Sequence, residues 1–87
     1  YLRQKNYPES LEALNKALLI AEKSNNLKEK GKILNNIGLI YKKQEKYIEA
    51  LSHHKEAYNI FVQLGLQKEI ESTRNILGYF KHVLNME

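Results

Sequence analysis

The 87-residue sequence contains no cysteine, a single proline and only two arginines among its fourteen basic residues. The absence of cysteine excludes disulfide bonds, thiolate nucleophiles and cysteine-ligated zinc, and it favours a reducing compartment, for which we expect the cytoplasm. No uncharged run approaches the roughly 20 apolar residues that span a bilayer, so we expect no membrane segment. The N-terminus also lacks the apolar core and small-residue cleavage site of a signal peptide.

The positive charge comes mainly from lysine, and the net charge is +4. A surplus of lysine is typical of a solvated helical surface, whereas specific reading of phosphates and bases relies more on the planar fork of arginine. A basic chain can attract nucleic acid or acidic proteins. The charge of the chain therefore permits nucleic-acid binding, but its low arginine content does not favour that function.

The sequence contains an internal repeat. Shifting the chain against itself by 40 residues aligns eleven identical residues. The matched pairs include Tyr1 with Tyr41, Tyr7 with Tyr47, Ala17 with Ala57, Ile20 with Ile60, Asn35 with Asn75, and Gly38 with Gly78. The chain therefore holds just over two copies of one unit.

Each copy has the pattern of two helices. Pro8 is suited to the first turn of a helix, Asn26 can cap the next helix with Glu29, and Gly65 can end a third helix in the left-handed conformation. Apolar residues recur at three- and four-residue spacing, and no segment of strand length alternates apolar with polar residues. The sequence therefore predicts an all-α chain of antiparallel helix pairs, without β-sheet.

This pattern divides the chain into parts of repeat units. We predict the end of an incomplete helix at residues 1–5, the second helix of one unit at residues 8–24, a complete unit at residues 28–64, and at residues 67–85 the first helix of a third unit or a capping helix. An incomplete first unit would leave the Leu11, Leu14 and Leu18 face of the helix at residues 8–24 uncovered.

The central unit resembles the tetratricopeptide repeat family. Residues 34–41 are Leu-Asn-Asn-Ile-Gly-Leu-Ile-Tyr, and they are followed by Tyr47, Ala50 and Ala57. This matches the family's order of a large apolar residue, a glycine, a tyrosine and spaced alanines. The small residues Gly38, Ala50 and Ala57 would lie where two helices cross closely. The resemblance implies an α-solenoid of stacked helix pairs.

The chain departs from the family pattern in several places. Its period is 40 residues rather than about 34, and we expect the extra residues near 24–26 and 64–66. His54 occupies a core position that is usually aromatic or aliphatic, and Arg74 and Lys81 replace Leu34 and Tyr41 in the last copy. That last helix could be a polar cap. The long period resembles the subgroup of kinesin light chains, spindle-orientation adaptors and bacterial signalling proteins, whose members bind peptides or partner domains.

The resemblance also implies a concave face that is lined by the first helix of each pair. The residues predicted to line it are Lys32, Asn35, Asn36, Leu39, Lys42, Lys43, Ser72, Asn75, Tyr79 and His82. In the long-period subgroup an asparagine at the position of Asn36 holds the backbone of an extended peptide. Asn75 matches Asn35, and Ile76 stands where a second such asparagine would be.

Each of these features has a simpler interpretation as well. The amides could cap neighbouring helices or face water, and the lysines could either attract an acidic peptide or merely solvate the surface. His53 and His54 point about 100° apart on a helix and lack further ligands, so we predict no metal site. With no phosphate loop, nucleophile elbow or acid–histidine pairing, we predict no enzyme activity and no cofactor.

The sequence therefore favours a protein–protein interaction module that binds a peptide or a partner helix in its concave groove, within a larger regulatory or scaffold protein. The alternative is a structural fragment that forms homo-oligomers through its exposed terminal helices. A nucleic-acid binder comes third, and it would show steeply salt-dependent retention of DNA or RNA.

Overall fold

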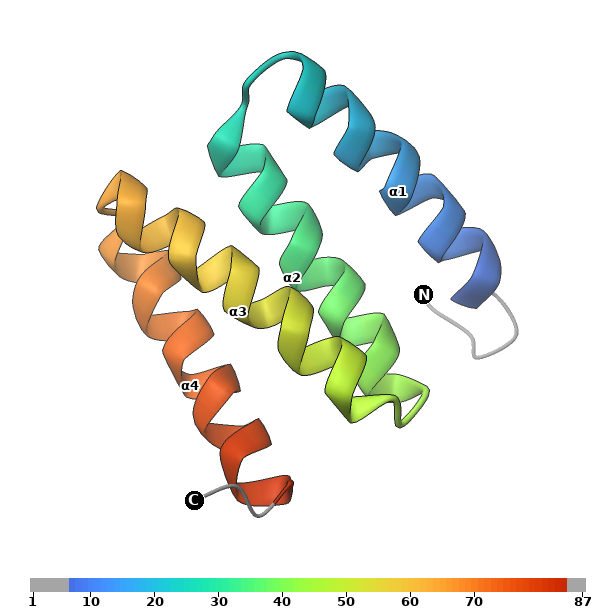
Figure 1. Cartoon of the computed structure of the whole chain (residues 1–87), viewed down its shortest axis with the longest axis vertical. Helices are drawn as coiled ribbons and strands as arrows, with labels where there is room; N and C mark the ends of the chain where they lie inside the picture. Colours follow the sequence, from blue (N-terminus) through green and yellow to red (C-terminus); the bar gives the residue numbers. More distant parts are fainter. Residues whose placement is uncertain (1–6, 85–87) are drawn as a thin grey trace.

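A computed structural model of the chain describes residues 7–84, which form four α-helices (Figure 1). The helices are α1 (Tyr7–Lys23), α2 (Leu27–Lys43), α3 (Tyr47–Leu64) and α4 (Gln67–Val83). No strand occurs among these residues, so the predicted all-α fold is confirmed. The helix end predicted at residues 1–5 lies outside the described part of the chain.

The helices follow one another at an even spacing, because they begin at residues 7, 27, 47 and 67. All three turns close in the same way. The backbone N–H of Asn26, Lys46 and Leu66 donates to the carbonyl five residues earlier, of Ala21, Tyr41 and Phe61, at 2.9, 2.8 and 3.1 Å. This is the hydrogen bond of a Schellman turn. The 40-residue period is thus two equal helix-and-turn units.

This regularity corrects one expectation. The extra residues of the long period do not gather near 24–26 and 64–66, since the turn at 44–46 is built like the other two. In each turn, the residue before the donor of the Schellman hydrogen bond has a left-handed backbone conformation, with φ of 56° at Asn25, 62° at Glu45 and 70° at Gly65. The predicted cap at Gly65 is confirmed. Asn26 also caps α2 as predicted, because its side chain accepts from the Glu29 N–H at 3.2 Å.

Consecutive helices run antiparallel and pack in chain order, α1 on α2, α2 on α3 and α3 on α4 (Figure 1). Side chains also join α2 directly to α4, where the Asn35 amide donates to the Thr73 hydroxyl at 3.1 Å. The shortest dimension of the molecule is 20 Å, which is two helix diameters. The helices therefore form two layers, in which α2 and α4 are neighbours.

Glycine and alanine bring α2 and α3 close together. A Cβ atom at Gly31 would lie 2.6 Å from the Phe61 ring, and one at Gly38 would lie 2.6 Å from Nε2 of His54. On the facing helix, Ala50 and Ala57 are fully buried. The close crossing predicted at Gly38, Ala50 and Ala57 is confirmed, Gly31 adds a second close approach, and His54 and Phe61 lie at the centre of the molecule.

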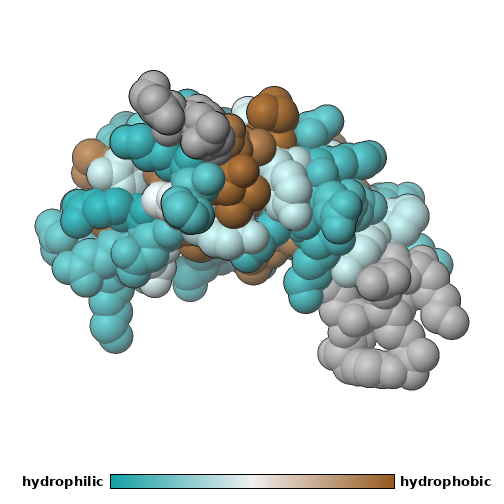
Figure 2. All heavy atoms as spheres, turned by 90° about the horizontal axis from the view of Figure 1, so that it is seen from below, coloured by the Kyte–Doolittle hydropathy of each residue, from teal (hydrophilic) through white to brown (hydrophobic). Residues whose placement is uncertain are grey.

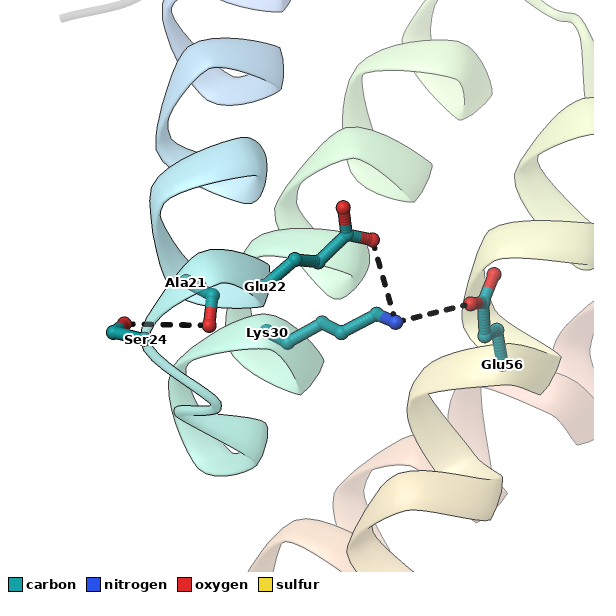
Figure 3. A network of polar contacts seen from close by, with 5 residues as sticks. All are labelled: Ala21, Glu22, Ser24, Lys30 and Glu56. Carbon is teal, nitrogen blue, oxygen red and sulfur yellow. Dashed lines mark hydrogen bonds and ion pairs between the residues drawn. The ribbon is translucent and has the colours of Figure 1, made fainter.

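An ion-pair network ties the first three helices together. Nζ of Lys30, near the start of α2, lies 3.3 Å from a carboxylate oxygen of Glu22 in α1 and 3.9 Å from one of Glu56 in α3 (Figure 3). The Ser24 hydroxyl donates to the Ala21 carbonyl at 3.3 Å beside this network. Because the carboxylates are largely exposed, the contribution to stability is modest, about 0.5 kcal/mol a pair.

The uncovered face of α1 is not the one expected. Leu11, Leu14 and Leu18 are half-buried because they pack against Ile33 and Ile37 of α2. The residues that stay exposed lie beside them, at Ala13, Leu19 and Ile20. Hydrophilic side chains cover most of the end of the molecule seen in Figure 2, and apolar side chains reach the surface between them.

Candidate functional site

A buried polar network joins three helices behind the predicted concave face. Asn35 of α2 donates its amide to Oγ1 of Thr73 in α4, at 3.1 Å, and its Oδ1 lies 2.8 Å from Nδ1 of His54 in α3. His54 and Thr73 are fully buried. Because the Asn35 nitrogen is the donor to Thr73, its oxygen faces the imidazole, and the imidazole must donate from Nδ1.

The second nitrogen of His54 has a different setting. Nε2 packs against Gly38, and it has no hydrogen-bond partner among the residues that the structure describes. Burial, with smaller effects of His53 and Lys42, lowers the pKa of His54 from 6.5 to about 4. The ring is therefore neutral at pH 7 and serves as a core residue, as predicted. Phe80 stacks against it with ring centroids 5.5 Å apart.

A hollow lies between α2 and α4, on the face that was predicted to be concave. Its volume is about 440 Å³, and we call it the groove cavity. It is lined by Lys32, Asn35, Asn36, Phe61, Lys68, Glu69 and Ser72. Four of the ten predicted face residues therefore meet around one cavity. Phe61 is fully buried, so its ring forms the floor of the cavity.

Two further predicted residues contact each other across the same face. Nζ of Lys42 lies 4.2 Å from the centre of the Tyr79 ring, which is a cation–π contact between α2 and α4. Tyr79 is 43% exposed, and its ring also packs edge-on against Phe80. The tyrosine thus reaches the surface, and its ring already contacts a lysine.

A second hollow lies between α1 and α2, with a volume of about 430 Å³, and we call it the α1 cavity. It is lined by Ser10, Ala13, Leu14, Asn36, Leu39, Ile40 and Lys43. Three predicted face residues, Asn36, Leu39 and Lys43, thus meet here with side chains of α1. Asn36 lines both cavities and is exposed.

The remaining two predicted residues stand apart. Asn75 and His82 are exposed on α4 and line neither cavity. Three residues that line the groove cavity, Phe61, Lys68 and Glu69, were not among the predicted face residues. Gly31 could have indicated Phe61, because the absence of a side chain at Gly31 lets the Phe61 ring approach α2. Lys68 and Glu69 could have been found through the repeat, because they match Lys28 and Glu29 at the start of a helix.

The structure adds two observations on other kinds of site. Within residues 7–84, no group of three or more histidine and acidic side chains could hold a metal ion. None of the four described helices combines the length and apolar character that crossing a bilayer requires.

Evenly spaced antiparallel helices with a groove between alternate helices are the architecture of an α-solenoid built from helical repeats. The family model of the tetratricopeptide repeat matches residues 1–76, and the chain belongs to this family. The family is generally a non-enzymatic repeat module that mediates protein–protein interaction. No curated protein and no solved structure gave a significant match to the chain.

Proposed function

We propose that the chain is a protein-interaction module that binds a peptide segment of its partner along the face formed by α2 and α4. The observation that carries this proposal is the groove cavity, where Lys32 and Asn36 of α2 face Ser72 of α4 above the buried Phe61 ring. An aromatic floor with a rim of donors and acceptors suits a ligand that has both side chains and backbone polar groups.

Asn36 is the residue in the best position to hold the backbone of a peptide. Its side chain is exposed between the groove cavity and the α1 cavity, and no hydrogen bond to another described residue engages it. An amide can donate to a peptide carbonyl and accept from a peptide N–H at the same time. Asn35 has a different role, because His54 and Thr73 occupy its side chain.

The charges on this face favour an acidic peptide. Lys32 and Lys68 line the groove cavity, and Glu69 is the one carboxylate among its described lining residues. Lys43 lines the α1 cavity on the other side of Asn36. Clustered cations speed the approach of an anionic ligand and select against basic ones. Affinity should therefore fall as the salt concentration rises.

The test is to select peptides from a random displayed library against the whole 87-residue chain and to measure one selected peptide by fluorescence anisotropy. Asn36→Ala should weaken binding by about tenfold or more, because it removes paired hydrogen bonds from a partly desolvated site. Asn59→Ala is the matched control, since Asn59 is an exposed asparagine on the outer side of α3.

Three results would contradict the proposal. The first is a library that yields no binder, and the second is equal binding by the two alanine variants. The third is a selected peptide that protects amides of α3 and leaves those of α2 and α4 unchanged in hydrogen exchange. If the selected peptides are neutral or basic, the proposed preference for acidic peptides is wrong, but peptide binding at the α2–α4 face is not contradicted.

A further inference from the structure

Helices α2 and α4 lie side by side over about two turns and run in the same direction. Asn35 donates to Thr73 at 3.1 Å, and Nζ of Lys42 lies 4.2 Å from the centre of the Tyr79 ring. The two α2 residues are seven positions apart and the two α4 residues are six positions apart, so both contacts belong to one parallel register. A ligand that lies between these helices therefore meets successive levels of the same helix pair.

One end of this face is cationic. The groove cavity lies toward the starts of α2 and α4, where Lys32 and Lys68 line it together with a single carboxylate, Glu69. The aromatic ring of the cavity, that of Phe61, is fully buried and offers little surface to a ligand. We call Lys32 and Lys68 the cationic end of the face, and their charge favours a carboxylate side chain.

The opposite end exposes apolar side chains. The large hydrophobic residues that are exposed on α2 and α4 are Leu39, Tyr79 and Val83, and all three lie in the second half of their helices. Leu39, which also lines the α1 cavity, is 40% exposed, and Tyr79 is 43% exposed. We call Leu39 and Tyr79 the apolar end. Because Lys42 and the edge contact with Phe80 already hold the Tyr79 ring, packing on it costs little further side-chain entropy.

The distance between the two ends determines the spacing of the groups that a ligand must present. Lys32 and Lys42, which contacts Tyr79, are ten residues apart on α2, or about 15 Å along the helix axis. An extended peptide advances about 3.3 Å per residue and covers this distance in about four to five residues. Successive side chains of an extended peptide point to opposite sides, so two that face one surface are an even number of positions apart. A spacing of four positions meets both conditions.

We propose that the α2–α4 face recognises peptides at two points, by a carboxylate side chain at the cationic end and, four positions away, an aromatic or large aliphatic side chain at the apolar end. This inference rests on the proposed function and adds the second anchor and the spacing. Asn36 lines the groove cavity between the two ends, where it can hold the backbone of the intervening residues. An exposed ion pair contributes little alone, so affinity requires both anchors together.

The peptides selected from the random displayed library against the whole chain give the first measurement. When they are aligned on their acidic residue, aromatic or large aliphatic residues should be enriched four positions away and not three or five. Inserting one alanine between the two anchors of a selected peptide should raise its Kd by about tenfold or more, because only one anchor can then engage. Replacing an intervening residue by alanine keeps the spacing, and as the matched control it should change the Kd much less.

Variants of the chain then assign each anchor to its end of the face. Tyr79→Ala should raise the Kd of a selected peptide by about tenfold, but it should not affect the same peptide whose apolar anchor is already alanine. Lys32→Gln should show the same dependence on the acidic anchor, with glutamine as its replacement in the peptide. Val62→Ala and Lys55→Gln are the matched controls, because both residues are exposed on α3 and line neither cavity. Such paired substitutions separate a lost contact from a general loss of stability.

The possible failures are distinguishable. If binding still depends on Asn36, then selected peptides without the four-residue spacing would overturn this inference and leave the proposed function in place. The same holds if Tyr79→Ala weakens both forms of the peptide equally. Binding that Asn36→Ala does not affect, or a library that yields no binder, would overturn the proposed function and this inference together.

Discussion

Asn35 and Asn36 are neighbours in α2, yet their side chains have opposite surroundings. Asn35 points into the junction of α2, α3 and α4, where both of its polar ends have partners. Asn36 points outward between the two cavities. Adjacent helical residues point about 100° apart, so one step along the chain separates a structural amide from a candidate binding amide.

The first prediction concerns the stability that Asn35 provides. Asn35→Ala should lower the free energy of unfolding by about 1–3 kcal/mol, because it leaves the buried His54 and Thr73 side chains without their partner. Urea denaturation followed by circular dichroism measures this change. Asn36→Ala is the matched control and should stay within about 0.5 kcal/mol of the wild type. Equal effects of the two substitutions would contradict the assignment.

The second prediction concerns pH. His54 has a pKa of about 4 in the folded chain and 6.5 when it is unfolded. Between these values the unfolded state binds a proton that the folded state refuses, so the free energy of unfolding should decrease as the pH falls from 6.5 toward 4. The loss is on the order of 2–3 kcal/mol in total.

The control for this effect is His54→Leu, because leucine occupies the equivalent position 14 in the first copy. Subtracting the variant's pH profile from that of the wild type removes the contribution of the carboxylates, which both proteins share. The difference should grow as the pH falls from 6.5 to 4. Parallel profiles would show that the histidine does not titrate in this range.

At the scale of the helix, α2 and α4 carry a glycine at the same repeat position with different surroundings. Gly38 lies under the His54 ring, whereas a Cβ at Gly78 would have no neighbour within 4 Å. Helix α2 is packed between α1 and α3, whereas α4 packs mainly on α3 and contacts α2 through a few side chains. Close packing therefore requires a glycine at position 38 in α2, whereas no neighbouring atom requires one at position 78 in α4.

The third prediction compares alanine at these two positions. Gly38→Ala should destabilise the chain by about 1–3 kcal/mol, since the hydrogen-bonded His54 ring would have to move. Gly78→Ala should stabilise it by up to about 1 kcal/mol, because alanine has the higher helix propensity. Thermal unfolding of both variants measures the two changes. A change of the same sign in both variants would contradict this explanation.

Much of the helix arrangement could be predicted from the sequence. The helix starts near Pro8 and after Asn26, and the stop at Gly65, depend on local chemistry that the sequence displays directly. The position of the extra residues could not be predicted, because Asn25 and Glu45 adopt the left-handed conformation without being glycine. That conformation costs about 1 kcal/mol outside glycine, and the chain adopts it because helix packing on both sides of the turn fixes the backbone.

At the scale of the whole molecule, α1 is the least supported of the four described helices. Within residues 7–84 it packs mainly on α2, while α2 and α3 each pack strongly on two described helices. The Lys30 bridge to Glu22 links α1 to the rest of the chain near its last turn (Figure 3). Regions with few buried contacts open locally at a lower free energy than the core.

The fourth prediction follows from this difference. In native-state hydrogen exchange, amides in the middle of α1 should exchange at least about tenfold faster than those in the middle of α3. Equal protection in the two helices would show that the whole chain opens as one cooperative unit.

The sequence by itself determined the helical period, the duplicated unit and the small residues at which helices approach closely, since all three depend on the order of residue types along the chain. Only the tertiary structure decided which side chains share a cavity, which amide lies inside and which face of α1 stays open. Those properties depend on the rotation and contact of whole helices, and residues as far apart as Asn35 and Thr73 are brought together only by that packing.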